Sequence, residues 1–420
     1  MKTAATRVHT DRPPAVLWVM AEPIARGVRR RRGASERLRG EAAAVGVCSS
    51  SKGLRIPYHN KADGFMAALV LTLNQVKFCE LHGCQPQVFW GPFPACKYAG
   101  VRFPDRTPFY DRAIGGNAFE YFFRPICRWH AAAQQAPPSL SCEQREKVHR
   151  VLPWAVRTYY YGADKGSQPR MANDTYDEDW YGRQRAEGAR LVSSYLRLQP
   201  RVARRLAALS ASLLDDSGSS GGNTMVSGHG SATGSTDDGR FSPQRRLGPV
   251  LGVHLRGTDK GRYASAGSGR AIGPAEYEPY VHAFLRSHGP NASVLVATDS
   301  PSYLAEVRTS WEAKWPGGRI RYRGDVLRHE DNVAFRKEQG AGRKGGGGGS
   351  TGGTGSSNYR KGEEVLLDTL LLSRCDFLLH SASGVAEFAI YWSPALHKAS
   401  VHLQYTRGRQ QPAWMTTSPS

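Results

Sequence analysis

Three short apolar runs in the second half of the chain each end in a cluster of polar residues, at positions 254–260, 298–300 and 380–384. The first cluster contains Arg256, whose guanidinium can donate two parallel hydrogen bonds to a phosphate. The third contains the hydroxyls of Ser381 and Ser383 just ahead of a predicted helix, and a helix N-terminus binds anions through its unpaired backbone N–H groups. Together these residue types indicate a site for a nucleotide diphosphate.

Each of these residues also has a structural interpretation when it is taken alone. His254 could be a hydrogen-bonded core histidine, Asp259 could pair with a neighbouring cation, and the two serines could be helix caps. Asp368 lies in an otherwise apolar helical run, where a carboxylate without a partner is costly, so we expect it to have a role in binding. The combination of residues, rather than any single one, predicts a ligand site.

The elements that carry these clusters form an alternating series. The predicted strands are 250–255, 294–297, 319–322, 377–379 and 399–403, and the predicted helices are 274–288, 301–311, 363–373 and 385–391. Such alternation predicts a parallel, doubly wound sheet with helices on both faces and right-handed crossovers. Ligands bind these sheets at the carboxyl ends of the strands, where the polar clusters lie. The second half is therefore predicted to be a Rossmann-like, nucleotide-binding α/β unit.

The first half is less regular but also predicts α/β structure, with a helix over 65–81, a strand over 87–90 and a long connector helix over 178–198. Low-complexity stretches separate the parts. We expect a disordered basic tail over 1–50, an N-terminal α/β domain over 51–214, a linker over 215–248, and a C-terminal domain over 249–410 with a glycine-rich insertion at 340–356. Two α/β halves facing a cleft would suit a large, flexible ligand.

The segment GVHLRGTDK at 252–260 resembles the first motif of the α1,6-fucosyltransferase family, which includes the nodulation-factor fucosyltransferases and is related to the protein O-fucosyltransferases. Residues 294–300, followed by a helix, resemble the second motif, and residues 364–388 resemble the third. The turn Asp63-Gly64-Phe65 before a helix is similar to the family's N-terminal donor loop. The resemblance extends over 249–404 and, less closely, over 53–90.

This resemblance implies a GT-B-like fold of two Rossmann-like domains that face a cleft. It implies transfer of L-fucose from GDP-fucose to a hydroxyl of a glycan or glycoprotein, with inversion and without a metal or other cofactor. It also implies a place in the Golgi or secretory-pathway lumen.

Site residues follow from the same resemblance, with Arg256 expected to contact the β-phosphate and stabilise the departing GDP. The residues expected to take part in catalysis are Arg256, Asp259 and Lys260. The residues expected to bind the donor are His254, Arg256, Asp299, Asp368, Ser381, Ser383 and Gly64.

Two positions depart from the family's pattern. Core-fucosylating members have a second arginine directly after the first, and here that residue is Gly257. They also have a glutamate four residues beyond the lysine, a proposed base for the acceptor hydroxyl, and here that residue is Ala264. The sequence therefore leaves the acceptor and the catalytic base unassigned. The arginine on which the donor assignment depends, Arg256, is present.

Three other functions remain to be weighed. A metal-dependent glycosyltransferase would use an Asp-x-Asp, which Asp177 and Asp179 match, although acids are also expected where a helix begins. A non-catalytic nucleotide- or glycan-binding protein of the same fold would account for Ala264. The net charge of +21 would suit a nucleic-acid partner, but we expect none because the basic N-terminal stretch lacks interleaved aromatic residues.

The cysteine spacing and the hydropathy of the chain bear on two further features, a zinc site and a membrane-spanning helix. The seven cysteines include no CxxC pair, so no zinc site is predicted. No apolar stretch reaches the roughly 18 residues that a membrane-spanning helix needs, and the N-terminus has no clear signal peptide. A membrane anchor is therefore not visible in the sequence.

Overall fold

The structure is a computed structural model, and its described part comprises residues 53–57, 64–82, 85–91, 96–98, 101–103, 109–126, 178–215, 248–257, 272–326, 328, 356–403, 412 and 414. The predicted tail at 1–50 lies outside these residues. So do the predicted linker, apart from its two end residues, and the predicted insertion up to residue 355. These three boundaries stay predictions.

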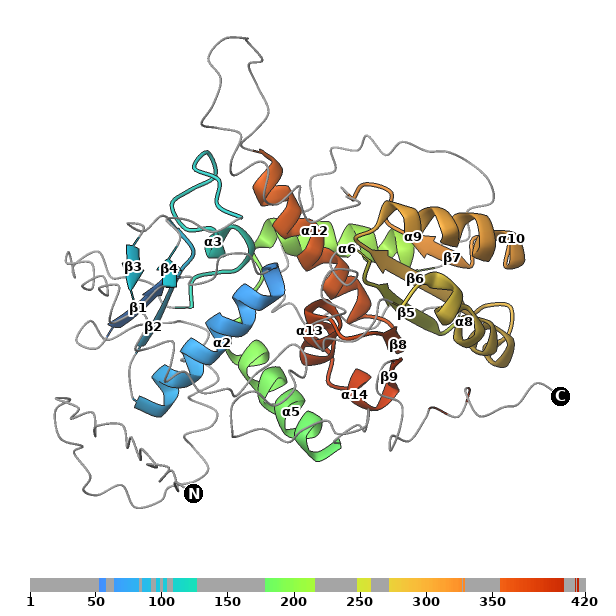
Figure 1. The fold of residues 1–420 in the computed structure, drawn as a ribbon, viewed down its shortest axis with the longest axis horizontal. Helices are drawn as coiled ribbons and strands as arrows, with labels where there is room; N and C mark the ends of the chain where they lie inside the picture. Colours follow the sequence, from blue (N-terminus) through green and yellow to red (C-terminus); the bar gives the residue numbers. More distant parts are fainter. Residues whose placement is uncertain are drawn as a thin grey trace, which may run out of the picture.

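A five-stranded parallel sheet forms the centre of the second half (Figure 1). Its strands are β5 (Val250–Leu255), β6 (Ser293–Thr298), β7 (Ile320–Tyr322), β8 (Phe377–His380) and β9 (Ser400–His402). Their order is β7-β6-β5-β8-β9. Every residue of β5 and β6 is buried, as expected for central strands that are covered on both faces. The prediction of a parallel α/β sheet is confirmed.

One face of the sheet is covered by the helices that connect β5, β6 and β7. These are α8 (Pro274–His288), α9 (Pro301–Glu306), the π-helical turn η4 (Val307–Trp311) and α10 (Glu312–Lys314). Ser300 caps α9 as predicted, because its Oγ accepts a hydrogen bond of 3.3 Å from the backbone N–H of Tyr303. Apolar side chains of α8 share a core with Leu251, Val253 and Leu255 of β5.

The other face is covered by α12 (Ser356–Leu372) and α13 (Gly384–Trp392), with the short α14 (Leu396–Ala399) before β9. The end of α12 lies directly on β5. A Cβ atom added at Gly252 would come within 3.0 Å of Leu372 and 3.1 Å of the Cys375 sulfur. Since side chains alternate along a strand, His254 shares this face with Gly252.

The first half consists of small strand pairs and longer helices. β1 (Gly53–Pro57) pairs in parallel with β2 (Gln85–Phe89), and β3 (Cys96–Tyr98) pairs antiparallel with β4 (Val101–Phe103). The helices are α2 (Phe65–His82), α3 (Phe119–Phe122), α5 (Glu178–Tyr195) and α6 (Pro200–Leu213). The helix predicted over 178–198 is confirmed but ends at Tyr195. A second helix, α6, begins at Pro200, since proline is favoured at the first helical position.

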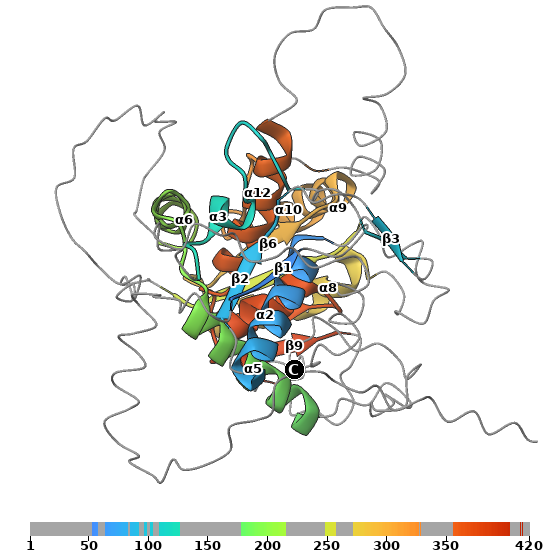
Figure 2. The same cartoon turned by 90° about the vertical axis from the view of Figure 1, so that its left-hand side faces the viewer.

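A single hydrophobic cluster joins the two halves. It combines apolar residues of α2, α5 and α6 with Leu366, Leu370, Phe388 and Tyr391 of α12 and α13. Figure 1 and Figure 2 show α2 and α5 lying side by side, and both helices contact α13. The helices of the first half therefore pack against α12 and α13, on the side of the sheet that these two helices cover.

Two cysteines have a defined state in the described part of the chain. Cys79, in α2, forms a disulfide bond, and Cys375 is a buried free thiol.

Among the described helices, none has both the length and the apolar character needed to cross a bilayer.

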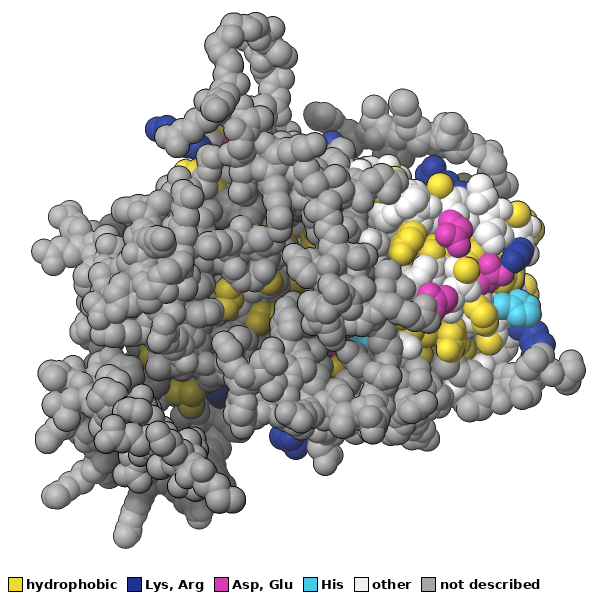
Figure 3. Space-filling view, viewed as in Figure 1, with side chains coloured by type: hydrophobic (Ala, Val, Ile, Leu, Met, Phe, Trp, Pro, Cys, Tyr) yellow, Lys and Arg dark blue, Asp and Glu magenta, His cyan; other side chains and the backbone are white. Residues whose placement is uncertain are grey.

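The surface over α8, α9 and α10 carries acidic and basic side chains interspersed with apolar ones (Figure 3). Binding to nucleic acid needs basic side chains clustered on one face or along a helix. The described part of this face shows no such cluster.

Candidate nucleotide site at the sheet switch point

The strand order creates a topological switch point between β5 and β8. From β5 the chain continues to β6 and β7 on one side, and then crosses over to β8 and β9 on the other. The connections after β5 and β8 leave toward opposite faces of the sheet, and doubly wound sheets bind their ligands at the carboxyl ends of the strands at such a switch point. Arg256 follows β5 directly and Ser381 follows β8 directly, so both residues lie at this switch point.

Arg256 and the N-terminus of α13 meet there. The Nη1 of Arg256 donates a hydrogen bond of 3.2 Å to the carbonyl oxygen of Ala382. Ser383 caps α13, because its Oγ accepts from the backbone N–H of Val385 at 3.2 Å. A guanidinium and the partial positive charge of a helix N-terminus thus lie together, which favours an anion at this position. The structural interpretation of Ser383 as a cap is correct, and it does not conflict with a place at the site.

A buried tyrosine holds the two strand ends together. The hydroxyl of Tyr277, on α8, donates to the carbonyl oxygen of His254 at 3.1 Å, and it also hydrogen-bonds with Ser381. Burial raises the pKa of Tyr277 above its ordinary value, so the hydroxyl keeps its proton as a donor. Tyr277 therefore links the ends of β5 and β8 from the side of the sheet that α8 covers.

Gly257 has a packing reason for lacking a side chain. Its N–H donates a hydrogen bond of 2.9 Å to Oδ1 of Asp299, the residue that follows β6. A Cβ atom at Gly257 would lie only 2.6 Å from the Cβ of Ser300. The second arginine of the family's first motif would therefore not fit at this position.

His254 belongs to a row of three buried histidines on neighbouring strands. His254 pairs in register with His380, and His380 pairs with His402. The rings of His380 and His402 are 4.8 Å apart between centroids. Within the described ranges, no group of three or more His, Cys, Asp or Glu side chains is arranged to hold a metal ion. The row fills the strand ends on the face that α12 and α13 cover.

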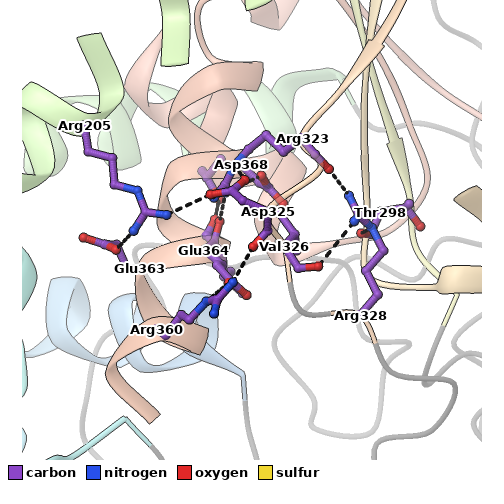
Figure 4. Close-up of polar contacts among 12 residues, drawn as sticks. Arg205, Thr298, Arg323, Asp325, Val326, Arg328, Arg360, Glu363, Glu364 and Asp368 are labelled. Atoms are coloured by element: carbon purple, nitrogen blue, oxygen red, sulfur yellow. Dashed lines mark hydrogen bonds and ion pairs between the residues drawn. The ribbon is translucent and has the colours of Figure 1, made fainter. Parts of the chain in front are cut away.

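Asp368 lies on α12 in an ion pair. Its Oδ1 accepts a hydrogen bond of 2.9 Å from Arg323, which follows β7 (Figure 4). The side chain of Asp368 is 16% exposed and that of Arg323 is 2% exposed. Burial raises the pKa of Asp368 above its ordinary value, and the positive charge of Arg323 opposes that rise. The expected partner of the carboxylate is thus a second residue of this chain, and Oδ2 accepts no hydrogen bond from the described residues.

Arg323 and Asp368 are part of a larger charged network that joins α6, the end of β7 and α12 (Figure 4). Arg323 also donates to Asp325, at 3.1 and 3.0 Å. Arg205 of α6 donates to Asp325 and to Glu363, and Arg360 donates to Glu364 at 2.8 Å. This network holds the loop after β7 against α12.

Gly64 stands directly before α2, and its carbonyl oxygen accepts hydrogen bonds from the N–H groups of Ala67 and Ala68. The first turn of α2 lies against α12, since the Thr369 hydroxyl is 3.9 Å from the Met66 sulfur. Thr369 directly follows Asp368. The predicted donor turn of the first half thus lies near α12, at the turn that contains Asp368.

The structure therefore brings most of the predicted site residues to one edge of the sheet. The residues gathered at this edge are His254, Arg256, Asp299, Asp368, Ser381 and Ser383, with Gly64 nearby. Asp259, Lys260, Ala264 and Asp177 lie outside the described residues. Asp179 lies in the first turn of α5, where an acidic residue is expected in any helix.

Comparison with known proteins adds a weak structural likeness. No family model and no curated protein matches this chain. Among solved structures, it is similar to the NodZ α-1,6-fucosyltransferase soaked with GDP-fucose, at 14% identity and a TM-score of 0.38, over 82% of this chain and 94% of that one. The fucosyltransferase NodZ from Bradyrhizobium is similar at 14% identity and a TM-score of 0.37, over 81% and 92%. At these values the likeness by itself establishes neither fold nor function.

Three residues of this edge were not predicted from the sequence: Tyr277, Arg323 and Arg328. Tyr277 has helical apolar spacing and looks like an ordinary core residue. Arg323 and Arg328 follow the short strand β7 in a segment without a motif. Their place at the site depends on the sheet order, which no local pattern records.

Proposed function

We propose that this protein is a glycosyltransferase that uses a nucleotide-diphosphate sugar, and that its donor is GDP-fucose. The observation that carries the proposal is the meeting of Arg256 with the capped N-terminus of α13 at the switch point between β5 and β8. A switch point of this kind is where a doubly wound sheet binds nucleotides. The segments that resemble the three motifs of the fucosyltransferase family each contribute residues to this edge of the sheet, which supports the proposal.

The chemistry follows from the charge that develops in the reaction. The acceptor hydroxyl attacks C1 of the sugar, the bond from C1 to the β-phosphate oxygen breaks, and the hydroxyl proton passes to a base. As GDP departs, negative charge grows on its β-phosphate. A guanidinium and helix N–H groups already aimed at that position stabilise the transition state more than the ground state. We propose this role for Arg256 and the α13 N-terminus, with Asp259 and Lys260 near the sugar or the acceptor.

Selection of guanine is proposed for the edge near α12. Guanine presents two neighbouring N–H groups, and a carboxylate can accept hydrogen bonds from both. Oδ2 of Asp368 is available for this contact, while Arg323 holds Oδ1. His254 lies on the face of β5 that α12 covers, and we propose that it supports the donor site from there. Asp299, Ser381, Ser383 and Gly64 would complete the donor site.

The remaining features of the family stay part of the proposal. We propose transfer to a glycan or glycoprotein hydroxyl with inversion and without a metal, in a GT-B-like arrangement of two domains facing a cleft. The disulfide bond of Cys79 supports an oxidising compartment such as the Golgi or secretory lumen. The base that accepts the acceptor's proton is not assigned.

Calorimetric titration of the full chain with GDP, GDP-fucose and UDP tests the donor. We expect GDP and GDP-fucose to bind, and UDP to bind at least tenfold more weakly. Preferential binding of UDP would exclude the fucosyltransferase proposal. Binding of GDP-fucose without any release of GDP across a panel of glycan acceptors would favour the non-catalytic alternative. Loss of activity in EDTA, with recovery in manganese, would instead favour a metal site at Asp177 and Asp179.

A further inference from the structure

Arg328 is a half-buried arginine whose guanidinium contacts only backbone carbonyls. Its Nε donates to the Thr298 carbonyl at 3.2 Å, its Nη1 to the Val326 carbonyl at 3.4 Å, and its Nη2 to the Arg323 carbonyl at 2.7 Å (Figure 4). These bonds use three donors, whereas a guanidinium has five. Among the described residues, no carboxylate lies within 4.0 Å of Arg328.

The other arginines of the network are neutralised. Arg205, Arg323 and Arg360 each donate to at least one carboxylate. Burial lowers the pKa of Arg328, and the positive charges of Arg308 and Arg323 lower it further, against the opposing effect of Asp368. A partly buried cation is costly unless an anion accompanies it. Arg328 therefore has the environment of a residue that receives its anion from outside the chain.

Its position is at the nucleotide edge. Thr298, whose carbonyl Arg328 binds, pairs in register with Leu255, the residue before Arg256. Neighbouring strands of a sheet lie about 4.8 Å apart, so Arg328 contacts the end of β6, the strand next to the one that Arg256 follows. The hydrogen bond from Gly257 to Asp299 joins these same two strand ends.

We propose that Arg328 is a second phosphate-binding arginine, which binds a nucleoside diphosphate together with Arg256. The inference rests on the proposed function, and it names a residue that the sequence motifs do not contain. Ser300 leaves no room for a side chain at Gly257, so the first motif holds one arginine only. Arg328 supplies the second positive charge from the loop after β7 instead.

The test compares Arg328→Gln and Arg328→Lys with wild type in the full chain. A matched control is Arg308→Gln, because Arg308 lies close by but is exposed and bonds to the Tyr322 hydroxyl at 2.9 Å. Each protein is titrated calorimetrically with GDP, guanosine and inorganic pyrophosphate, and its melting temperature is measured. Guanosine lacks phosphates and pyrophosphate lacks the base, so the two probes separate the contributions of the charge and the nucleoside.

We expect Arg328→Gln to weaken binding of GDP and pyrophosphate by about tenfold or more, as charge-assisted hydrogen bonds do. Guanosine affinity should stay within about twofold, Arg328→Lys should recover part of the loss, and Arg308→Gln should match wild type. Equal pyrophosphate affinity in Arg328→Gln and wild type would overturn the inference. A similar loss of affinity for all three ligands, together with a lower melting temperature, would also overturn the inference, because that result indicates a structural role for Arg328. If wild type binds pyrophosphate through Arg328 but does not bind GDP, the donor proposal fails and the assignment of Arg328 stands.

Discussion

At the scale of single residues, the site depends on where charge is placed and where side chains are excluded. Arg256 lies at the end of a fully buried strand, so its position is set by the sheet and not by a loose loop. Gly257 lets β5 approach Asp299 and Ser300. Tyr277 bridges the strand ends with one hydroxyl. Each of these roles depends on atoms contributed by two or three elements.

The first prediction concerns Arg256. Arg256→Lys keeps one positive charge but loses the planar fork that can bind a phosphate through two N–H groups. We expect GDP release with acceptor to fall by about 10²–10³, the usual cost of removing one such transition-state donor. The melting temperature should stay within about two degrees of wild type, since a lysine ammonium can also reach the Ala382 carbonyl that Arg256 contacts at 3.2 Å.

Arg308→Lys serves as the control, because it makes the same chemical change at an exposed residue of η4. Near wild-type turnover in a folded Arg256→Lys protein would remove Arg256 from the mechanism.

At the scale of elements, an exposed charged cluster joins α2 to α5. Glu187 of α5 accepts from Arg190, with 2.8 Å between Nη2 and Oε1, and lies 2.9 Å from the Lys77 nitrogen of α2. Arg190 also binds Glu80 of α2. The hydrogen bond from Arg190, supported by Lys77, lowers the pKa of Glu187 from 4.5 to about 2. The ionised form of Glu187 is therefore favoured in the folded state.

The second prediction follows from the direction of this shift. A carboxyl with a lowered pKa in the folded state contributes stability above its unfolded pKa and loses it as pH falls through the folded value. Glu187→Gln should lower the free energy of unfolding at pH 7 by about 1 kcal/mol, since solvent screens such pairs. The difference from wild type should shrink between about pH 4.5 and 2.

Urea denaturation at several pH values measures this difference. Glu306→Gln, an exposed acid of α9 with no ion pair in the described chain, should show no such pH dependence. A difference between wild type and Glu187→Gln that is constant across this range would refute the linkage.

At the scale of the whole molecule, the two halves are joined through a buried ion pair as well as a hydrophobic core. Arg185 of α5 donates two hydrogen bonds, of 3.0 and 2.7 Å, to Glu387 of α13. The side chains are 2% and 4% exposed. Nη1 of Arg185 lies 3.0 Å from Nδ1 of His397, and its guanidinium lies 5.0 Å from the centre of the Tyr181 ring. The connector helix α5 is thus tied to α13, the helix whose N-terminus contributes to the proposed nucleotide site.

The third prediction concerns this pair. Glu387→Gln leaves Arg185 as a buried charge without its carboxylate, which typically costs about 3–5 kcal/mol. The double variant Arg185→Met with Glu387→Leu removes both charges, so it should be more stable than Glu387→Gln. Denaturant unfolding of wild type and both variants measures this. A double variant less stable than Glu387→Gln would show that the pair contributes more than its desolvation costs.

The sequence by itself determined the elements of the second half and the residues that follow its strands. Periodicity located β5, α8, β6 and α13 to within a residue or two, because these elements are long or fully buried and their apolar patterns are local. Pro301 and Ser300 marked the start of α9 in the same way. The motif around Arg256 and the serines before α13 were also local features, and the alternation of elements implied that they would share one edge of the sheet.

Only the tertiary structure decided which residues from distant segments meet at that edge. The order β7-β6-β5-β8-β9 brings the loop after β7 to α12, so Asp368 acquires Arg323 as a partner and Arg328 comes to lie beside Thr298. The bond from Tyr277 to β5 and the exclusion of a side chain at Gly257 arise in the same way. These contacts depend on packing between elements far apart in the chain, and hydrophobic periodicity records which face of an element is buried but not what it is buried against.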